Sequence, residues 1–89
     1  MSEFTRAPRV LVVEDDEDIA QALQRSLRME GYEVRAAADG NAALEHGRTF
    51  APDLVILDLG LPELDGIEVA KRLRDGADVP ILILTARDA

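Results

Sequence analysis

The chain has 89 residues, of which 47% are hydrophobic and 31% charged, a balance typical of one folded domain rather than of a disordered segment. Eighteen acidic residues against ten basic ones give a formal charge of −8, which opposes binding to nucleic acid or to an anionic membrane surface. The sequence contains no cysteine, which excludes disulfides, thiolate metal sites and thiol nucleophiles. Neither a signal-peptide pattern nor an apolar run of roughly 20 residues is present, so we expect a cytoplasmic protein.

The first third of the chain predicts a strand followed by a helix. Residues 1–8 show no periodicity and are expected to form a flexible N-terminus, ahead of a single domain over residues 9–89. The stretch Arg9–Val13, which is β-branched or leucine after its first residue, is typical of a strand buried on both faces. From Glu17 the spacing becomes helical, and Gly31 is expected to end the helix. The apolar positions of this helix are Ile19, Leu23 and Leu27.

The remaining pattern continues the alternation of strands and helices. It predicts a strand over Tyr32–Ala37, a helix over about Asn41–Thr49, a strand within Ala51–Leu59 and a helix over about Ile67–Arg74. Asp39 is placed to cap the second helix, and the run ILILT predicts a fourth strand that ends at Thr85. Apolar strands that alternate with amphipathic helices indicate an α/β fold, with an open parallel sheet covered on both sides.

Polar side chains follow three of the predicted strands. Glu14 and Asp15 come directly after the first strand, Asp58 ends the third and Thr85 ends the fourth. Because parallel strands share a direction, all of these residues are expected at one edge of the sheet. In an open sheet of order 2-1-3-4-5, the first and third strands are neighbours about 4.8 Å apart. We therefore expect Glu14, Asp15 and Asp58 to converge.

Three converging carboxylates predict a metal site. They repel one another unless some are protonated or a cation lies between them. Only oxygen ligands are available at this edge, so a hard divalent ion that keeps some of its water fits best. We expect Mg²⁺, with Mn²⁺ as a possible substitute.

An ordinary structural explanation also exists for part of the acidic run. Acidic residues before a helix often only complement the helix dipole and remain solvated. We assign Asp16, Glu17 and Asp18 to that role, whereas Asp58, which comes from another strand, supports a site for Glu14 and Asp15. His46 falls within the second predicted helix and is expected at the surface, away from this edge. Thr85 taken alone would more often be an ordinary residue at a strand end.

Several ordered stretches resemble the receiver domain of two-component response regulators. They are VLVVEDDEDIAQALQRSLRMEGYEV, PDLVILDLGLPELDGIEVAKRLR and VPILILTARDA, which together cover nearly the whole chain from Arg9. The resemblance implies a flavodoxin-like sheet with Asp58 as the phosphoacceptor, Glu14 and Asp15 as metal-holding acids, the Gly60 backbone carbonyl as a further metal ligand, and Thr85 as the switch hydroxyl. Many receivers carry a bulkier residue, often Met, where Gly60 stands.

The resemblance also implies partners. The phosphoryl donor would be a phosphohistidine on a sensor histidine kinase, and the chain would act as a signalling module rather than as an enzyme. Glutamate at position 14, in place of aspartate, is typical of regulators with a winged-helix DNA-binding output, although this chain is not itself expected to bind nucleic acid. A carboxylate can attack phosphorus to form an acyl phosphate, and the transfer needs mainly positioning and charge neutralisation.

The sequence departs from the receiver pattern at its end. Receivers continue with a helix, a strand and a helix that carry a phosphate-contacting lysine, and no lysine of this chain matches that position. We therefore expect a receiver truncated after the fourth strand, with strand order 2-1-3-4. Its exposed fourth-strand edge would favour self-association.

Two other function classes remain open at this point. The first is an interaction module that dimerises or binds a partner without phosphorylation. The second is a haloacid-dehalogenase-like phosphatase, which also uses an aspartate at a strand end together with Mg²⁺. That class requires a second aspartate two residues later, and Gly60 stands there instead.

Overall fold

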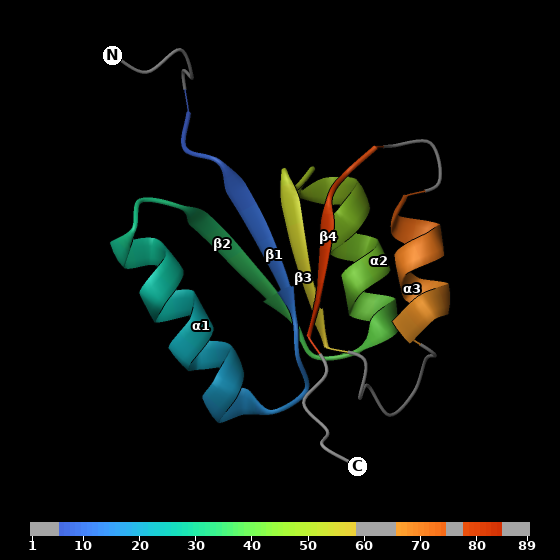
Figure 1. Ribbon diagram of the computed structural model, residues 1–89, viewed down its shortest axis with the longest axis horizontal. Helices are drawn as coiled ribbons and strands as arrows, with labels where there is room; N and C mark the ends of the chain where they lie inside the picture. Colours follow the sequence, from blue (N-terminus) through green and yellow to red (C-terminus); the bar gives the residue numbers. More distant parts are fainter. Residues whose placement is uncertain (1–5, 59–65, 75–77, 85–89) are drawn as a thin grey trace.

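The computed structural model describes residues 6–58, 66–74 and 78–84, and over this part it alternates strands and helices from β1 to β4 (Figure 1). The strands are β1 (Arg9–Val13), β2 (Glu33–Ala37), β3 (Leu54–Asp58) and β4 (Ile81–Leu84). The helices are α1 (Glu17–Met29), α2 (Gly40–Thr49) and α3 (Gly66–Leu73). The predicted order of elements is confirmed, with boundaries that differ by one residue for β2, α2 and α3.

The strands form a parallel sheet of order β2-β1-β3-β4, which confirms the predicted open α/β architecture. In the register of β1, Val13 lies beside Ala37 of β2 on one side and Leu57 of β3 on the other. Helix α1 covers one face of the sheet, and α2 and α3 cover the other (Figure 1). The carboxyl ends of β1 and β3 therefore meet at the same edge.

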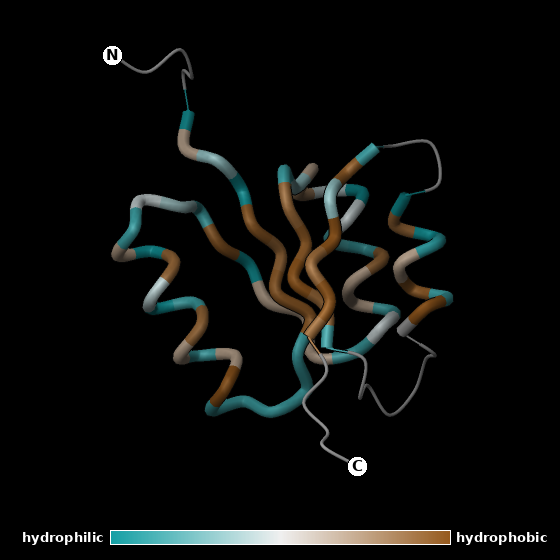
Figure 2. The backbone as a smooth tube through the Cα atoms, in the orientation of Figure 1, coloured by the Kyte–Doolittle hydropathy of each residue, from teal (hydrophilic) through white to brown (hydrophobic). Residues whose placement is uncertain are grey.

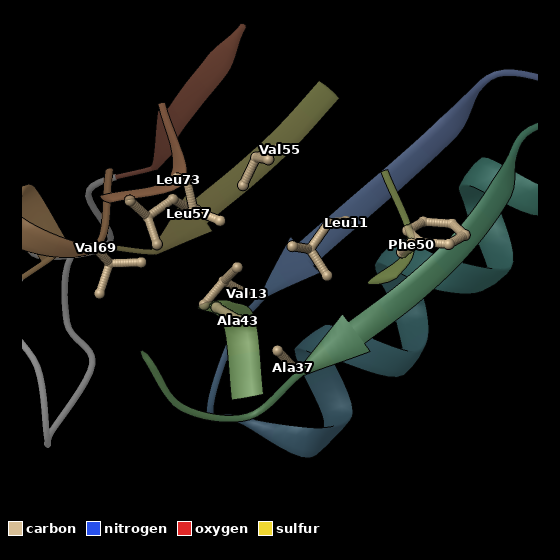
Figure 3. Close-up of a cluster of buried hydrophobic side chains, with 9 residues drawn as sticks. All are labelled: Leu11, Val13, Ala37, Ala43, Phe50, Val55, Leu57, Val69 and Leu73. Atoms are coloured by element: carbon tan, nitrogen blue, oxygen red, sulfur yellow. The ribbon is translucent and has the colours of Figure 1, made fainter. Parts of the chain in front are cut away.

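The core lies on both faces of the sheet and is aliphatic apart from Phe50. This explains the apolar runs of the strands, which Figure 2 colours as hydrophobic. Alternate strand residues point to opposite faces, so each face needs its own helical cover. On the α1 face the buried residues are Val10, Val12, Val34 and Ile56. On the α2 and α3 face they are Leu11, Val13, Ala37, Ala43, Phe50, Val55, Leu57, Val69 and Leu73 (Figure 3).

Helix ends follow the predicted capping chemistry. The Ala42 N–H donates to Asp39 Oδ1 at 2.8 Å, so the predicted cap of α2 is confirmed. After α1 the chain turns at Gly31, whose φ of +97° lies in the left-handed region that glycine adopts without strain. Ala51, just after the C-cap of α2, has a φ of +53° and does carry a side chain there.

The amino end of the sheet is held by an ion-pair network around Asp53, the residue before β3. Arg6 Nη1 lies 3.0 Å from Asp53 Oδ2, and Arg6 Nη2 lies 3.4 Å from Asp53 Oδ1. The Arg9 N–H donates to Asp53 Oδ2 at 2.8 Å, while the Asp53 N–H donates to the Arg9 carbonyl, also at 2.8 Å. These bonds tie the segment before β1 to the start of β3.

Two arginines from neighbouring strands stack over the buried Phe50 ring. The guanidinium carbon of Arg35 lies 4.8 Å from the ring centroid, and that of Arg9 lies 5.7 Å from it. Arg9 Nη1 also donates to the Phe50 carbonyl at 3.1 Å. Cation–π contacts of this kind favour a fixed position for the end of α2 against β1 and β2.

Several apolar side chains of β4 and α1 remain exposed. Leu82 and Ile83 of β4 are 52% and 40% exposed, and Ile19 in the first turn of α1 is 46% exposed. Leu23 and Leu27 pack against the core beneath α1 and are half-buried. Within the described residues, no helix has the length and apolar character needed to cross a membrane.

Candidate metal and phosphoacceptor site

Glu14 and Asp58 reach the same place because β1 and β3 are paired. Leu57 lies beside Val13 in the register. Glu14 and Asp58, the residues that follow them, therefore both lie at the carboxyl edge of the sheet. The Glu14 N–H donates to the Ala37 carbonyl at 3.0 Å, which extends the pairing of β1 with β2 by one residue. Figure 2 shows the hydropathy changing abruptly where β1 runs into the loop that leads to α1.

The structure brings Glu14, Asp15 and Asp58 together, as the sequence predicted. Each offers a carboxylate oxygen, and these three oxygens lie within 4.8 Å of one another. Glu14 and Asp58 are each only 6% exposed, whereas Asp15 is exposed. Two buried acids and one solvent-facing acid therefore form an oxygen-lined position that opens toward water.

Electrostatics at this edge disfavour the charged form of Glu14. Burial raises the pKa of the Glu14 carboxyl, and the neighbouring Asp58 and Asp15 carboxyls raise it further. The Asp16 N–H, which donates to Glu14 Oε2 at 3.0 Å, lowers this pKa because it favours the carboxylate. The net effect is a raised pKa. The Glu14 carboxylate is thus held by a hydrogen bond, but its acidic neighbours do not compensate its charge.

The sequence interpretation of Asp16 was incomplete. It was assigned to the solvated first turn, but it is the N-cap of α1: the Ile19 N–H donates to Asp16 Oδ1 at 3.1 Å. Its backbone N–H also bonds the Glu14 carboxylate. An aspartate just before a helical pattern is a recognised cap signal, so the capping role was readable from the sequence. The bond to Glu14 was not, because it depends on the path of the loop.

The remaining residues that were singled out from the sequence have different outcomes. Gly60 and Thr85 lie outside the described residues, so their predicted roles stay predictions. His46 lies in the last turn of α2 and is half-buried rather than at the surface. Lys71, in α3, is exposed.

The arrangement suits a hard cation. Its donors are carboxylate oxygens, the ligands that Mg²⁺, Ca²⁺ and Mn²⁺ prefer. A cation there would offset the repulsion that raises the Glu14 pKa. A hollow of about 440 Å³, lined in part by Glu14, Asp15 and Glu17, adjoins the cluster on the β2 side and gives it access to solvent.

Comparison with known proteins identifies the family. The family model described as the response regulator receiver domain matches residues 10–89. Among curated proteins, response regulator MprA of Mycolicibacterium vanbaalenii is 50% identical over 82 residues, which cover 91% of this chain and 36% of that protein. MprA of Mycobacterium ulcerans is also 50% identical, with 35% of its length covered. The chain thus spans about a third of the curated relatives that it matches.

Solved structures agree with this assignment. Response regulator TrrA from Thermotoga maritima, solved in complex with Mg²⁺-BeF, superposes with a TM-score of 0.84 and is 40% identical, covering 91% of this chain and 71% of that one. The chemotaxis protein CheY4 of Vibrio cholerae superposes with a TM-score of 0.86 at 35% identity, covering 93% of this chain and 72% of that one. The sequence match, the sheet order and the acidic edge agree, and the chain belongs to the response regulator receiver domain family.

Proposed function

We propose that Asp58 accepts a phosphoryl group from a phosphohistidine of a sensor histidine kinase. The observation that carries the proposal is the approach of three carboxylates, within 4.8 Å, at the carboxyl edge of a receiver sheet. In the reaction an Asp58 carboxylate oxygen forms a bond to phosphorus while the phosphorus–nitrogen bond of the donor breaks, so an acyl phosphate forms and imidazole leaves. A cytoplasmic location fits this role.

Mg²⁺ is the proposed cofactor, held by Glu14, Asp15 and Asp58, with the Gly60 carbonyl as a further ligand. When bound, it would neutralise negative charge on the phosphoryl oxygens. The chain's own residues supply the rest: β1 and β3 position the acids, and the Asp16 N–H orients Glu14. Thr85 is proposed to contact the phosphoryl group. A transcriptional output, implied by the resemblance of Glu14 to the pattern of winged-helix regulators, would belong to a larger protein.

Intact-mass measurement tests the assignment of Asp58. The chain is incubated with a small phosphoramidate donor, with Mg²⁺ or with a chelator, and the fraction carrying one phosphoryl group is measured. We expect a Mg²⁺-dependent adduct in the wild type and none in Asp58→Asn. An adduct of equal yield in Asp58→Asn would place the acceptor elsewhere.

We further propose that copies of this chain associate through β4. Within the described residues β4 pairs on one side only, with β3, and its side chains Leu82 and Ile83 are both exposed. An apolar strand edge of this kind favours pairing with another chain. An interaction module that works without phosphorylation would use the same surface, so this proposal stands independently of Asp58.

Light scattering coupled to size-exclusion chromatography, over a dilution series, tests the association. We expect the apparent mass to rise with concentration in the wild type and to stay monomeric in Leu82→Lys. Met29→Lys is the matched control, because Met29 is an exposed apolar residue of α1 outside the sheet. A wild type that stays monomeric at every concentration would refute the proposal.

A further inference from the structure

Asp16 makes hydrogen bonds through three different atoms, and they link α1 to the acidic edge. Its side-chain Oδ1 accepts from the Ile19 N–H at 3.1 Å, and its carbonyl accepts from the Ala20 N–H at 2.9 Å. Its own N–H donates to Glu14 Oε2 at 3.0 Å. Two of these bonds belong to the first turn of the helix, and the third belongs to a residue of the candidate metal site.

The capping bond fixes the direction of the Asp16 N–H. Capping requires an extended backbone at Asp16, and the observed φ of −81° and ψ of 115° meet this requirement. The same dihedral angles determine where the preceding peptide group points, and it points at the Glu14 carboxylate. Without the cap, the first turn of α1 would fray, and this N–H would lose its fixed orientation.

Glu14 depends on that N–H more than an exposed acid would. Its carboxylate is almost fully buried beside Asp58, and a buried carboxylate needs hydrogen bonds that favour a single orientation. Groups that orient metal ligands in this way commonly change metal affinity by roughly 10- to 100-fold when they are removed.

We propose that Asp16 is a positioning residue for the metal site: by capping α1, it aims its own N–H at Glu14 and holds that carboxylate ready for a divalent cation. The inference rests on the proposed function, since it takes Glu14 as a metal ligand. Asp16 acts here through hydrogen-bond geometry and not through its negative charge. Asn and Ser cap helices about as well as Asp, so both should replace it.

Three substitutions at one position separate geometry from charge. Mg²⁺ is titrated into the wild type, Asp16→Asn, Asp16→Ser and Asp16→Ala, and its dissociation constant is followed from backbone amide chemical shifts. We expect Asp16→Ala to weaken Mg²⁺ binding roughly 10-fold. Asp16→Asn and Asp16→Ser should stay within a factor of about two of the wild type.

Asp39→Ala is the matched control for loss of a helix cap. Asp39 caps α2 by the same kind of bond, at 2.8 Å, and α2 contributes no residue to the carboxylate cluster. We expect its removal to lower the melting temperature about as much as Asp16→Ala does, while Mg²⁺ affinity stays unchanged. Hydrogen exchange at the Asp16 amide supplies a second readout, faster in Asp16→Ala than in Asp16→Ser.

Four results would overturn the proposal. Equal weakening in Asp16→Asn and Asp16→Ala would show that the charge of Asp16 acts. Unchanged Mg²⁺ affinity in a folded Asp16→Ala would reduce the cap to a purely structural role, and equal weakening in Asp39→Ala would indicate general destabilisation. Unchanged Mg²⁺ affinity in Asp15→Asn would instead show that the metal binds elsewhere, and the proposed function would then fail together with the inference.

Discussion

Acidic residues at the two ends of the sheet have pKa values shifted in opposite directions. At the amino end, Asp53 accepts hydrogen bonds from the Arg6 guanidinium and the Arg9 backbone N–H, and these bonds lower its pKa. At the carboxyl end, Glu14 is buried beside Asp58, and its pKa is raised. The charged groups that act most strongly on Glu14 are themselves acids.

This contrast separates a structural acid, Asp53, from the acids of the proposed metal site. The Arg6 guanidinium neutralises the charge of Asp53 within the protein itself. The bonds of Asp53 to Arg6 and Arg9 also tie the segment before β3 to the start of β1. The carboxyl end accumulates negative charge, which costs stability in the absence of a cation. Such an arrangement is expected where binding of an external cation is part of the function.

Neutralising one acid at each end should therefore change stability in opposite directions. With a chelator present, Glu14→Gln should raise the free energy of unfolding by on the order of 1 kcal/mol, because it relieves repulsion with Asp58 and keeps an acceptor for the Asp16 N–H. Asp53→Asn should lower it by about 1 kcal/mol. Urea unfolding measures both free energies. Changes of the same sign in the two variants would contradict the proposed difference between the two ends of the sheet.

The pH dependence of stability should differ in the same way. A raised pKa means that the contribution of Glu14 is present below its ordinary pKa of about 4.3 and is lost as the pH rises through the raised value. A lowered pKa means that the contribution of Asp53 is present above its ordinary pKa of about 3.9 and is lost as the pH falls through the lowered value.

Difference curves make this prediction measurable. The free energy of unfolding is measured without metal between about pH 3 and about pH 7, a range that spans both ordinary pKa values. The advantage of the wild type over Asp53→Asn should shrink toward low pH. The disadvantage of the wild type against Glu14→Gln should grow toward high pH, and parallel curves would contradict the assigned pKa directions.

Backbone substitutions at the amino end should change stability alone. Ala51 has a φ of +53°, so Ala51→Gly should stabilise by up to about 1 kcal/mol by relieving strain at the side chain. Gly31 has a φ of +97° with open space around it, so Gly31→Ala should destabilise by about 1 kcal/mol. Thermal unfolding measures both changes, and neither variant should alter Mg²⁺ affinity.

Local sequence signals predicted most of the fold. Apolar runs located the strands, and Asp39 located the start of α2. The meeting of Glu14 and Asp58 required one more step, the neighbouring positions of β1 and β3 in a parallel sheet. That step was available from the general strand order of such folds.

What the sequence did not reveal depends on contacts between distant residues. Arg6 and Asp53 are separated by 47 positions, and nothing near either one indicates the other. The stacking of Arg35 on Phe50 likewise follows from how α2 and β2 pack together. Such contacts are set by tertiary packing, which short-range periodicity does not encode.

Mg²⁺-dependent stability tests most directly the claim that the carboxyl edge, and not the amino end, binds a divalent cation. The melting temperature is measured against MgCl₂ concentration for the wild type, Asp15→Asn and Asp53→Asn. A ligand at ten times its dissociation constant adds about 1.4 kcal/mol of stability. We predict the same Mg²⁺-dependent gain in the wild type and Asp53→Asn, and almost none in Asp15→Asn. An equal gain in Asp15→Asn, or a gain lost only in Asp53→Asn, would contradict the account.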